Sequence, residues 1–284
     1  MRAEVFTRLE GASGLDRLGD RIQQVVQSIL RPKIIRDALH GVWLGHPLHP
    51  ALVQVPVGAW TSAAVLDLLP GQQRAATTLV GVGVASGVPA AVAGLNDWAV
   101  LSREERRVGL VHATGNTIAL LLYSMSLSAR LRGDHARGRL LAWLGFAAAS
   151  ASAYIGGHLA YHQGAQVNPS GPEMRRIPEG WHPVAEIARL PQGEMVGSRI
   201  GDVPILVYRD GDDVSVLLDH CGHQTGPLSE GQIVTVDGHA CVQCPWHGSV
   251  FRLDDGGIVH GPAGTDQPTL RTRVVDGVVH AALP

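Results

Sequence analysis

The 284-residue chain is poor in charged, aromatic and cysteine residues. Only 17% of its residues are charged, 5% are aromatic and three are cysteines. A typical soluble domain carries about 25% charged residues. The low charge excludes a disordered chain, and the composition is not that of a coiled coil or a collagen-like repeat. A membrane protein is not excluded, and the distribution of the charges decides this point.

The charges divide the chain into two unlike halves. Residues 1–162 hold 15 Lys and Arg against 10 Asp and Glu, whereas residues 163–284 hold 8 against 15. The overall charge of −2 therefore combines a basic first half with an acidic second half, a pattern typical of two parts in different surroundings. The first half also contains four stretches without a charged residue, at 38–66, 75–96, 108–129 and 140–172.

Each uncharged stretch is at least 22 residues long. About 20 helical residues cross the hydrocarbon core of a bilayer, so the pattern predicts a multi-pass membrane protein. The alternative is a soluble bundle of four buried helices, but such helices need a charged outer face, and these have none. The four membrane helices are predicted near 50–69, 75–96, 109–129 and 140–161.

The basic residues near the membrane indicate an orientation. Eight lie on the side that holds the N-terminus, the loop between the second and third helices and the C-terminus, against five on the other side. The positive-inside rule favours the first side as cytoplasmic, in a bacterial-type cell membrane. No cleavable signal peptide is apparent, and residues 15–29 are typical of an amphipathic helix on the lipid surface.

After a Pro- and Gly-containing linker, the pattern changes to short alternating or β-branched runs. These runs are separated by Asp-Gly turns and predict a small all-β domain. The predicted strands include 203–208, 214–218, 232–236, 269–275 and 278–282.

Two cysteine–histidine pairs lie in predicted loops of this domain: Cys221-Gly-His223 and Cys244-Pro-Trp-His247. Two thiolates and two imidazoles bind zinc, or a [2Fe–2S] cluster in which each iron takes one kind of residue. A zinc finger usually begins with a cysteine pair and ends with a histidine pair. The order Cys–His followed by Cys–His favours the cluster.

With their flanks, Gly226-Pro-Leu-Ser-Glu-Gly231 and Gly248-Ser-Val-Phe251, these motifs resemble the Rieske iron–sulfur family over roughly residues 180–284. The resemblance implies that Cys221 and Cys244 ligate one iron and that His223 and His247 ligate the other. It also implies that Ser249 tunes the potential by hydrogen bonding. Family members of high potential have a tyrosine where this chain has Phe251, which predicts a low to intermediate potential here.

The third cysteine, Cys241, lies three residues before Cys244 on a predicted strand. A Cys-x-x-Cys pair suggests zinc, but a small buried apolar side chain is the favoured interpretation. No disulfide pair then remains, which suits a reducing compartment.

The membrane half resembles an uncharacterised family of four-helix bacterial membrane proteins, through the motif Gly45-His-Pro-Leu-His-Pro50 and its surroundings. The predicted fold is an all-α four-helix transmembrane bundle followed by an all-β Rieske-type iron–sulfur domain. The predicted boundaries are 1–39 for a juxtamembrane segment, 40–165 for the bundle, 166–180 for the linker and 181–284 for the Rieske domain.

Five histidines of the bundle are expected near one membrane face. One hypothesis is haem b held by His112 and His158, with a second pair or a metal at His46 and His49. The others are a quinone pocket and ordinary interfacial residues that cap helices and bind headgroups.

The favoured function is a membrane-anchored Rieske electron-transfer protein, an electron carrier or oxidoreductase subunit more than a self-contained enzyme. Its expected partners are a redox protein or quinone and membrane lipid, with no nucleic acid. One alternative is an electron-transfer component of an oxygenase or reductase with a separate catalytic chain. Another is a zinc-bound structural or sensing module.

Overall fold

The computed structural model of the protein describes residues 2–284. The chain forms two compact units that interleave along the sequence. Residues 1–31 and 48–165 belong to a helical unit, whereas residues 32–47 and 166–284 belong to a unit rich in β-strands.

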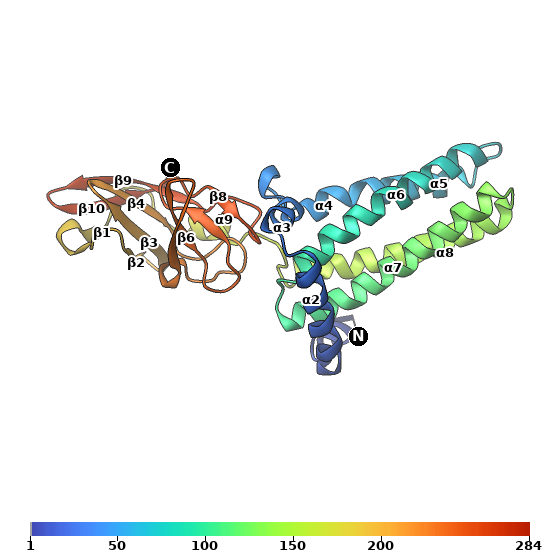
Figure 1. Ribbon diagram of the computed structural model, residues 1–284, viewed down its shortest axis with the longest axis horizontal. Helices are drawn as coiled ribbons and strands as arrows, with labels where there is room; N and C mark the ends of the chain where they lie inside the picture. Colours follow the sequence, from blue (N-terminus) through green and yellow to red (C-terminus); the bar gives the residue numbers. More distant parts are fainter. Residues whose placement is uncertain (1) are drawn as a thin grey trace. The chain divides into compact units, whose positions relative to one another are not determined.

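The helical unit begins with α1 (Arg2–Glu10) and α2 (Asp16–Ile29). It continues with the short helices α4 (Leu48–Leu52) and α5 (Gln54–Leu66) and the long helices α6 (Gln73–Trp98), α7 (Arg103–Leu131) and α8 (His135–Tyr161) (Figure 1). Within the described residues, the three long helices are long and apolar enough to cross a membrane. They match the helices predicted near 75–96, 109–129 and 140–161.

The segment predicted as a membrane helix at 50–69 is two shorter helices, α4 and α5, interrupted at Val53. Pro56 lies one turn after Leu52 and has no backbone N–H to donate to that carbonyl, which weakens a continuous helix here. The predicted count of four spanning helices is therefore approximate. Whether α4 and α5 together cross the bilayer stays a prediction.

Small residues let the helices of this unit approach closely. The Trp60 and Tyr123 rings stack with centroids 4.2 Å apart. A Cβ added to Gly83 would lie 2.1 Å from the Trp60 ring, and one added to Gly145 would lie 3.0 Å from the Tyr123 ring. These glycines are therefore required for aromatic packing between helices, as small residues commonly are in membrane bundles.

The apolar face of α2 is only partly covered within the helical unit. Ile22 and Val26 pack beside Trp98 and Leu101, while Ile29 remains 69% exposed. Its polar side is tied to α7, because Asp16 pairs with Arg107 at 2.7 Å and Asp20 pairs with Arg106 at 2.8 Å. The predicted amphipathic helix thus exists, and lipid contact by its exposed part stays a prediction.

The second unit contains two antiparallel sheets. The larger sheet has the order β1 (His182–Glu186), β10 (Val278–Ala282), β9 (Thr269–Val275), β4 (Asp213–Leu218), β3 (Val203–Asp210), β2 (Met195–Ile200). The smaller one has the order β5 (Gln232–Val236), β6 (His239–Gln243), β7 (Val250–Arg252), β8 (Ile258–His260). Strands β3, β4, β5, β9 and β10 confirm the five runs predicted from the sequence.

Strand β3 contributes to both apolar cores of this unit. Ile205 and Val207 enter one core, whereas Leu206 and Tyr208 enter the other. Alternate residues of a strand point to opposite faces, so a strand covered on both faces needs an uninterrupted apolar run. The second core also contains Cys221 and Cys244, which places the predicted metal ligands against rigid packing.

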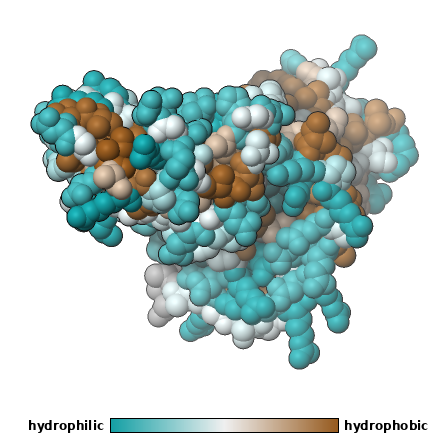
Figure 2. All heavy atoms as spheres, turned by 60° about the vertical axis from the view of Figure 1, so that its left-hand side comes forward, coloured by the Kyte–Doolittle hydropathy of each residue, from teal (hydrophilic) through white to brown (hydrophobic). Residues whose placement is uncertain are grey.

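The unit also includes α3 (Lys33–His40) and α9 (Ser170–Met174). On the face drawn in Figure 2, separate hydrophobic patches lie within a mostly hydrophilic surface. Such scattered exposure is ordinary for a folded protein.

Candidate metal centre

Two loops carry the predicted ligands to one place. Cys221 and His223 lie in the loop after β4, and Cys244 and His247 lie in the loop after β6. The His223 and His247 rings meet edge to face with centroids 5.1 Å apart, and the Cys221 and Cys244 thiols are close enough for each to shift the pKa of the other. The structure therefore brings all four side chains together.

The first loop is held by buried side-chain hydrogen bonds. The Gln267 carbonyl oxygen accepts from the Gly222 N–H at 3.1 Å, and its amide donates to the carbonyls of Leu218 and His220 at 2.8 and 2.9 Å. Asp219 accepts from the Ser229 N–H at 2.6 Å. Such partners fix the backbone from which ligands project.

The two loops approach so closely that one position requires glycine. A Cβ added to Gly226 would lie 2.8 Å from the Cys244 sulfur and 3.0 Å from the Trp246 ring. Within each loop the backbone folds back on itself, because Cys221 N–H donates to the Gly226 carbonyl at 2.9 Å and Cys244 N–H donates to the Ser249 carbonyl at 2.8 Å. These contacts prearrange both thiols.

The electrostatics suit a soft metal centre. The neighbouring Cys221 thiol and the N–H groups of Trp246 and His247 lower the pKa of Cys244 to about 6 despite burial. The neighbouring Cys244 thiol and burial raise the pKa of Cys221. Burial, followed by the charges of His247 and His40, lowers the pKa of His223 to about 3. A neutral imidazole and an easily formed thiolate are the metal-binding forms.

His223 provides a direct test of whether these residues fit a metal cluster. Its side chain is only 4% exposed, and its Nε2 is buried without a hydrogen-bond partner within residues 2–284. Buried nitrogens of this kind rarely lack a partner. Because two thiols and a second imidazole stand beside this ring, the donor set fits a [2Fe–2S] cluster with two cysteine and two histidine ligands.

Ser249 lies where the resemblance requires it. It is fully buried, its hydroxyl lowers the pKa of the neighbouring Cys221 thiol, and its Oγ accepts from the Ala263 N–H at 3.0 Å. The side chain thus lies between a predicted ligand sulfur and the 261–264 turn.

Cys241 is not part of the core cluster that contains Cys221 and Cys244. It lies on β6 and is fully buried, and its thiol donates to the His239 carbonyl at 3.5 Å. This placement agrees with its interpretation as a small core side chain.

A segment far away in the sequence completes the surroundings of these ligands. Asp37 of α3 accepts from the Gly261 N–H at 3.0 Å and lies 2.7 Å from the Nδ1 of His260. The His40 side chain is buried, and a Cβ added to Gly261 would lie 3.0 Å from its ring. The sequence did not predict that Asp37 and His40 lie beside the predicted ligands. The one feature that could have indicated a contact is the charge of Asp37 directly before two apolar residues.

The histidines of the helical unit fall into separate contact groups. His112 Nδ1 lies 2.8 Å from the Ser152 carbonyl, and its Nε2 lies 3.0 Å from the Asn116 amide. His49 Nδ1 lies 2.8 Å from the Ala90 carbonyl. His158 instead contacts Glu10 and stacks beside His162. His46 belongs to the other unit.

Comparison with known proteins agrees with both halves of the chain. Residues 180–271 match the Rieske [2Fe–2S] domain family. Residues 45–169 match a family described as predicted membrane proteins (DUF2231).

Individual relatives resemble the β-rich half alone. The anthranilate 1,2-dioxygenase ferredoxin subunit of Burkholderia cepacia is 33% identical over 99 residues, which are 35% of this chain and 88% of the relative. Ferredoxin CarAc of Metapseudomonas resinovorans is 34% identical over 85 residues, 30% of this chain and 76% of the relative. A solved complex of oxygenase and ferredoxin in carbazole 1,9a-dioxygenase contains a chain with 30% identity and a TM-score of 0.33, covering 37% of this chain and 94% of that one.

The fold, the donor set and the matches define an iron–sulfur protein. The chain belongs to the Rieske [2Fe–2S] family through residues 180–271, and residues 45–169 precede that domain with a match to the predicted membrane proteins of DUF2231. A Rieske domain implies a [2Fe–2S] cluster, and the similarity to ferredoxins supports electron transfer.

Proposed function

We propose that this chain is a membrane-anchored Rieske electron-transfer protein. The observation that carries the proposal is the convergence of two buried thiols, the partnerless Nε2 of His223 and the His247 ring on one spot. When bound, the cluster supplies a one-electron redox couple. Cys221, His223, Cys244 and His247 would hold it.

The two histidines are expected to differ in their access to partners. His223 is buried and covered by its own domain, whereas His247 is exposed and follows Trp246, whose exposed fraction is 56%. A redox partner would therefore approach the Trp246–His247 side. Trp246 offers a flat apolar contact surface of the kind enriched in protein interfaces.

The partner is proposed from the relatives. Two of them are ferredoxins, one of which is named as a subunit of a dioxygenase. This chain would likewise deliver electrons, either to an oxygenase or reductase with a separate catalytic chain or to a carrier such as a quinone. The zinc-bound structural module is the competing assignment for the same donor set.

Haem b between His112 and His158 stays a prediction, as does a quinone site. Both ring nitrogens of His112 already have partners, so haem ligation would require the bonds to Ser152 and Asn116 to rearrange. A haem stain and a visible spectrum test this: a Soret band supports haem, and its absence in protein with full iron content excludes it.

The cluster is tested on the full chain in membranes by combined visible and electron paramagnetic resonance spectroscopy with iron analysis. We expect about two iron atoms per chain, loss of the cluster signal in Cys244→Ala, and retention in the control Cys241→Ala. Zinc without iron in wild-type protein, or a signal unchanged in Cys244→Ala, would refute the proposal.

The orientation is proposed from the charge bias alone. Asp212 is exposed, so Asp212→Cys places a thiol on the surface of the Rieske domain. If this domain is cytoplasmic, a membrane-impermeant maleimide should label the variant only after the cells are opened. Labelling of intact cells would reverse the assignment.

A further inference from the structure

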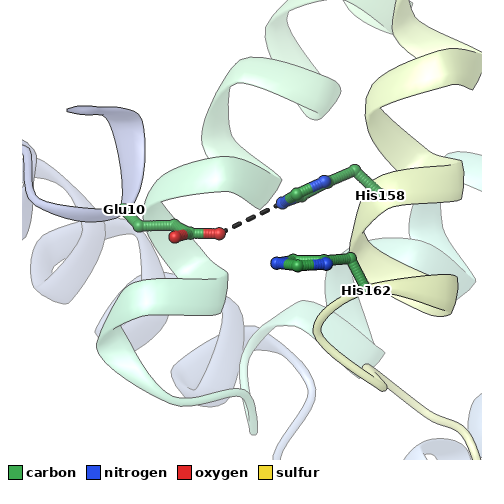
Figure 3. A group of neighbouring side chains, drawn as sticks. All are labelled: Glu10, His158 and His162. Carbon is green, nitrogen blue, oxygen red and sulfur yellow. Dashed lines mark hydrogen bonds and ion pairs between the residues drawn. The ribbon is translucent and has the colours of Figure 1, made fainter. Parts of the chain in front are cut away.

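A second group of metal-type ligands lies in the helical unit. His158 and His162 are one turn apart at the end of α8, and their rings stack with centroids 4.5 Å apart. Side chains four residues apart share one face of a helix, which is how paired histidines bind one metal ion. Figure 3 shows both rings directed towards the same carboxylate.

That carboxylate belongs to Glu10, the last residue of α1. Its Oε1 lies 3.1 Å from His158 Nε2 (Figure 3). One ligand atom from each of Glu10, His158 and His162 lies within 4.8 Å of the other two. Residues 148 apart in the sequence therefore form one compact donor group.

Neighbouring side chains hold this arrangement in place. Phe6 stacks on the His158 ring with centroids 3.7 Å apart, and the Gln163 amide donates to Glu10 Oε1 at 3.1 Å. Arg107 hydrogen-bonds the Glu10 carbonyl, and its positive charge is offset by Asp16 at 2.7 Å. The carboxylate and one imidazole are thus fixed, as good metal ligands are.

The third ligand distinguishes this group from an ordinary ion pair. A Glu10–His158 pair would be complete without His162, yet the exposed His162 ring lies against the same two groups. Two imidazoles and one carboxylate are a familiar ligand set for divalent transition metals, with metal–ligand distances of about 2.0–2.2 Å. Because His162 is exposed, its ring is the one of the three side chains that is free to adjust towards a bound ion.

We propose that Glu10, His158 and His162 bind one divalent first-row transition metal ion, of which Zn²⁺ is the test case. Three protein ligands leave at least one position open to water or a small ligand. The site shares no residue with the predicted Rieske ligands, so the test of this site is independent of the test of the proposed electron transfer. The haem hypothesis pairs His158 with His112, whereas this site pairs it with Glu10 and His162. A Soret band in the visible spectrum would indicate haem and not this site.

The test uses the full chain in detergent, with its iron content measured first so that the Rieske site is filled. After dialysis against Zn²⁺ and removal of loosely held ions, we expect one zinc per chain in addition to the iron. His162→Ala and Glu10→Gln should each weaken zinc binding at least tenfold. Because His162 is exposed, its replacement removes only its stacking contact with His158 and leaves no cavity in the core.

Two variants serve as matched controls. His239→Ala removes an exposed imidazole that lies 3.1 Å from a single carboxylate, Asp254, and Glu104→Gln removes an exposed acid of α7. Both should bind zinc like the wild type. Co²⁺ gives a second readout, since visible d–d bands of an ordered site should appear in the wild type and vanish in His162→Ala.

Either of two results would overturn the proposal. The first is a wild-type chain, with iron loaded, that retains no zinc after dialysis. The second is zinc retention that falls equally in the controls or stays unchanged in His162→Ala and Glu10→Gln, because this would show adventitious surface binding.

Discussion

Ser249 is the single side chain predicted to tune the proposed metal centre. Its hydroxyl lowers the pKa of the neighbouring Cys221 thiol, and a hydroxyl that hydrogen-bonds a ligand sulfur stabilises the more negative, reduced state. A net hydrogen bond of about 0.5–1.5 kcal/mol corresponds to roughly 20–60 mV for a one-electron couple.

We therefore expect Ser249→Ala to keep the cluster and lower its reduction potential by about 20–60 mV. Redox titration followed by electron paramagnetic resonance measures the shift. Ser198→Ala is the control, because that hydroxyl donates to a backbone carbonyl of the sheet at 2.7 Å. An unchanged or raised potential in Ser249→Ala would show that the hydroxyl does not tune the centre.

Asp67 and Arg130 form a buried ion pair between helices of the helical unit. Arg130 donates to both carboxylate oxygens of Asp67, and both side chains are at least 95% buried. Asp67→Ala leaves the Arg130 charge buried without its partner, so this variant should lower the free energy of unfolding by about 3–5 kcal/mol. Chemical denaturation in detergent measures the loss.

Replacing both partners gives the contrasting case. Asp67→Leu combined with Arg130→Met should cost less than Asp67→Ala alone, because no unpaired buried charge remains. If the double variant is less stable than Asp67→Ala, the prediction is wrong, and the ion pair itself contributes a net stabilisation.

At the scale of an element, the start of α7 is defined by a capping box. The Glu105 N–H donates to the Ser102 hydroxyl at 3.4 Å, and the Ser102 N–H donates to the Glu105 carboxylate at 2.8 Å. Two N–H groups that the helix cannot satisfy internally thereby gain acceptors. This explains why α7 begins at a charged sequence several residues before its apolar stretch.

Ser102→Ala should lower the free energy of unfolding by about 1 kcal/mol, whereas Ser102→Asp should retain most of it. Thermal unfolding of both variants in the same detergent provides the comparison. Equal losses in the two variants would mean that the side-chain oxygen does not cap the helix.

For the whole molecule, residues 32–47 form part of the unit that holds the Rieske ligands. Asp37 connects this segment to the rest of the unit through Gly261 and His260. Because hydrogen bonds to charged groups contribute about 1.5–3 kcal/mol, Asp37→Ala should accelerate hydrogen exchange at the Gly261 amide about tenfold or more. Asp254→Ala, which removes an exposed carboxylate, should leave that amide unchanged. Identical protection in wild type and Asp37→Ala would show that the segment is not held by this residue.

The sequence by itself determined the features that depend on local pattern and solvent. Stretches without charge predicted the helices α6, α7 and α8, because about 20 apolar residues are needed to cross a bilayer. Alternating runs predicted five strands, because a strand imposes a side-chain period of two. The two Cys–His motifs identified the family, since the order and spacing of the predicted ligands can be read from short stretches of neighbouring residues. The ligand roles of Cys221, His223, Cys244 and His247 await the spectroscopy described above.

The tertiary structure decided the pairings between distant residues. Local periodicity gives no information on which side chains meet across 60 to 220 residues, since that depends on helix packing and chain reversal. Only the folded chain showed Asp67 beside Arg130, Asp37 beside Gly261 and Glu10 beside two histidines. It also showed that the expected first membrane helix is divided at Val53 into α4 and α5, next to the Leu52 carbonyl to which Pro56 has no N–H to donate.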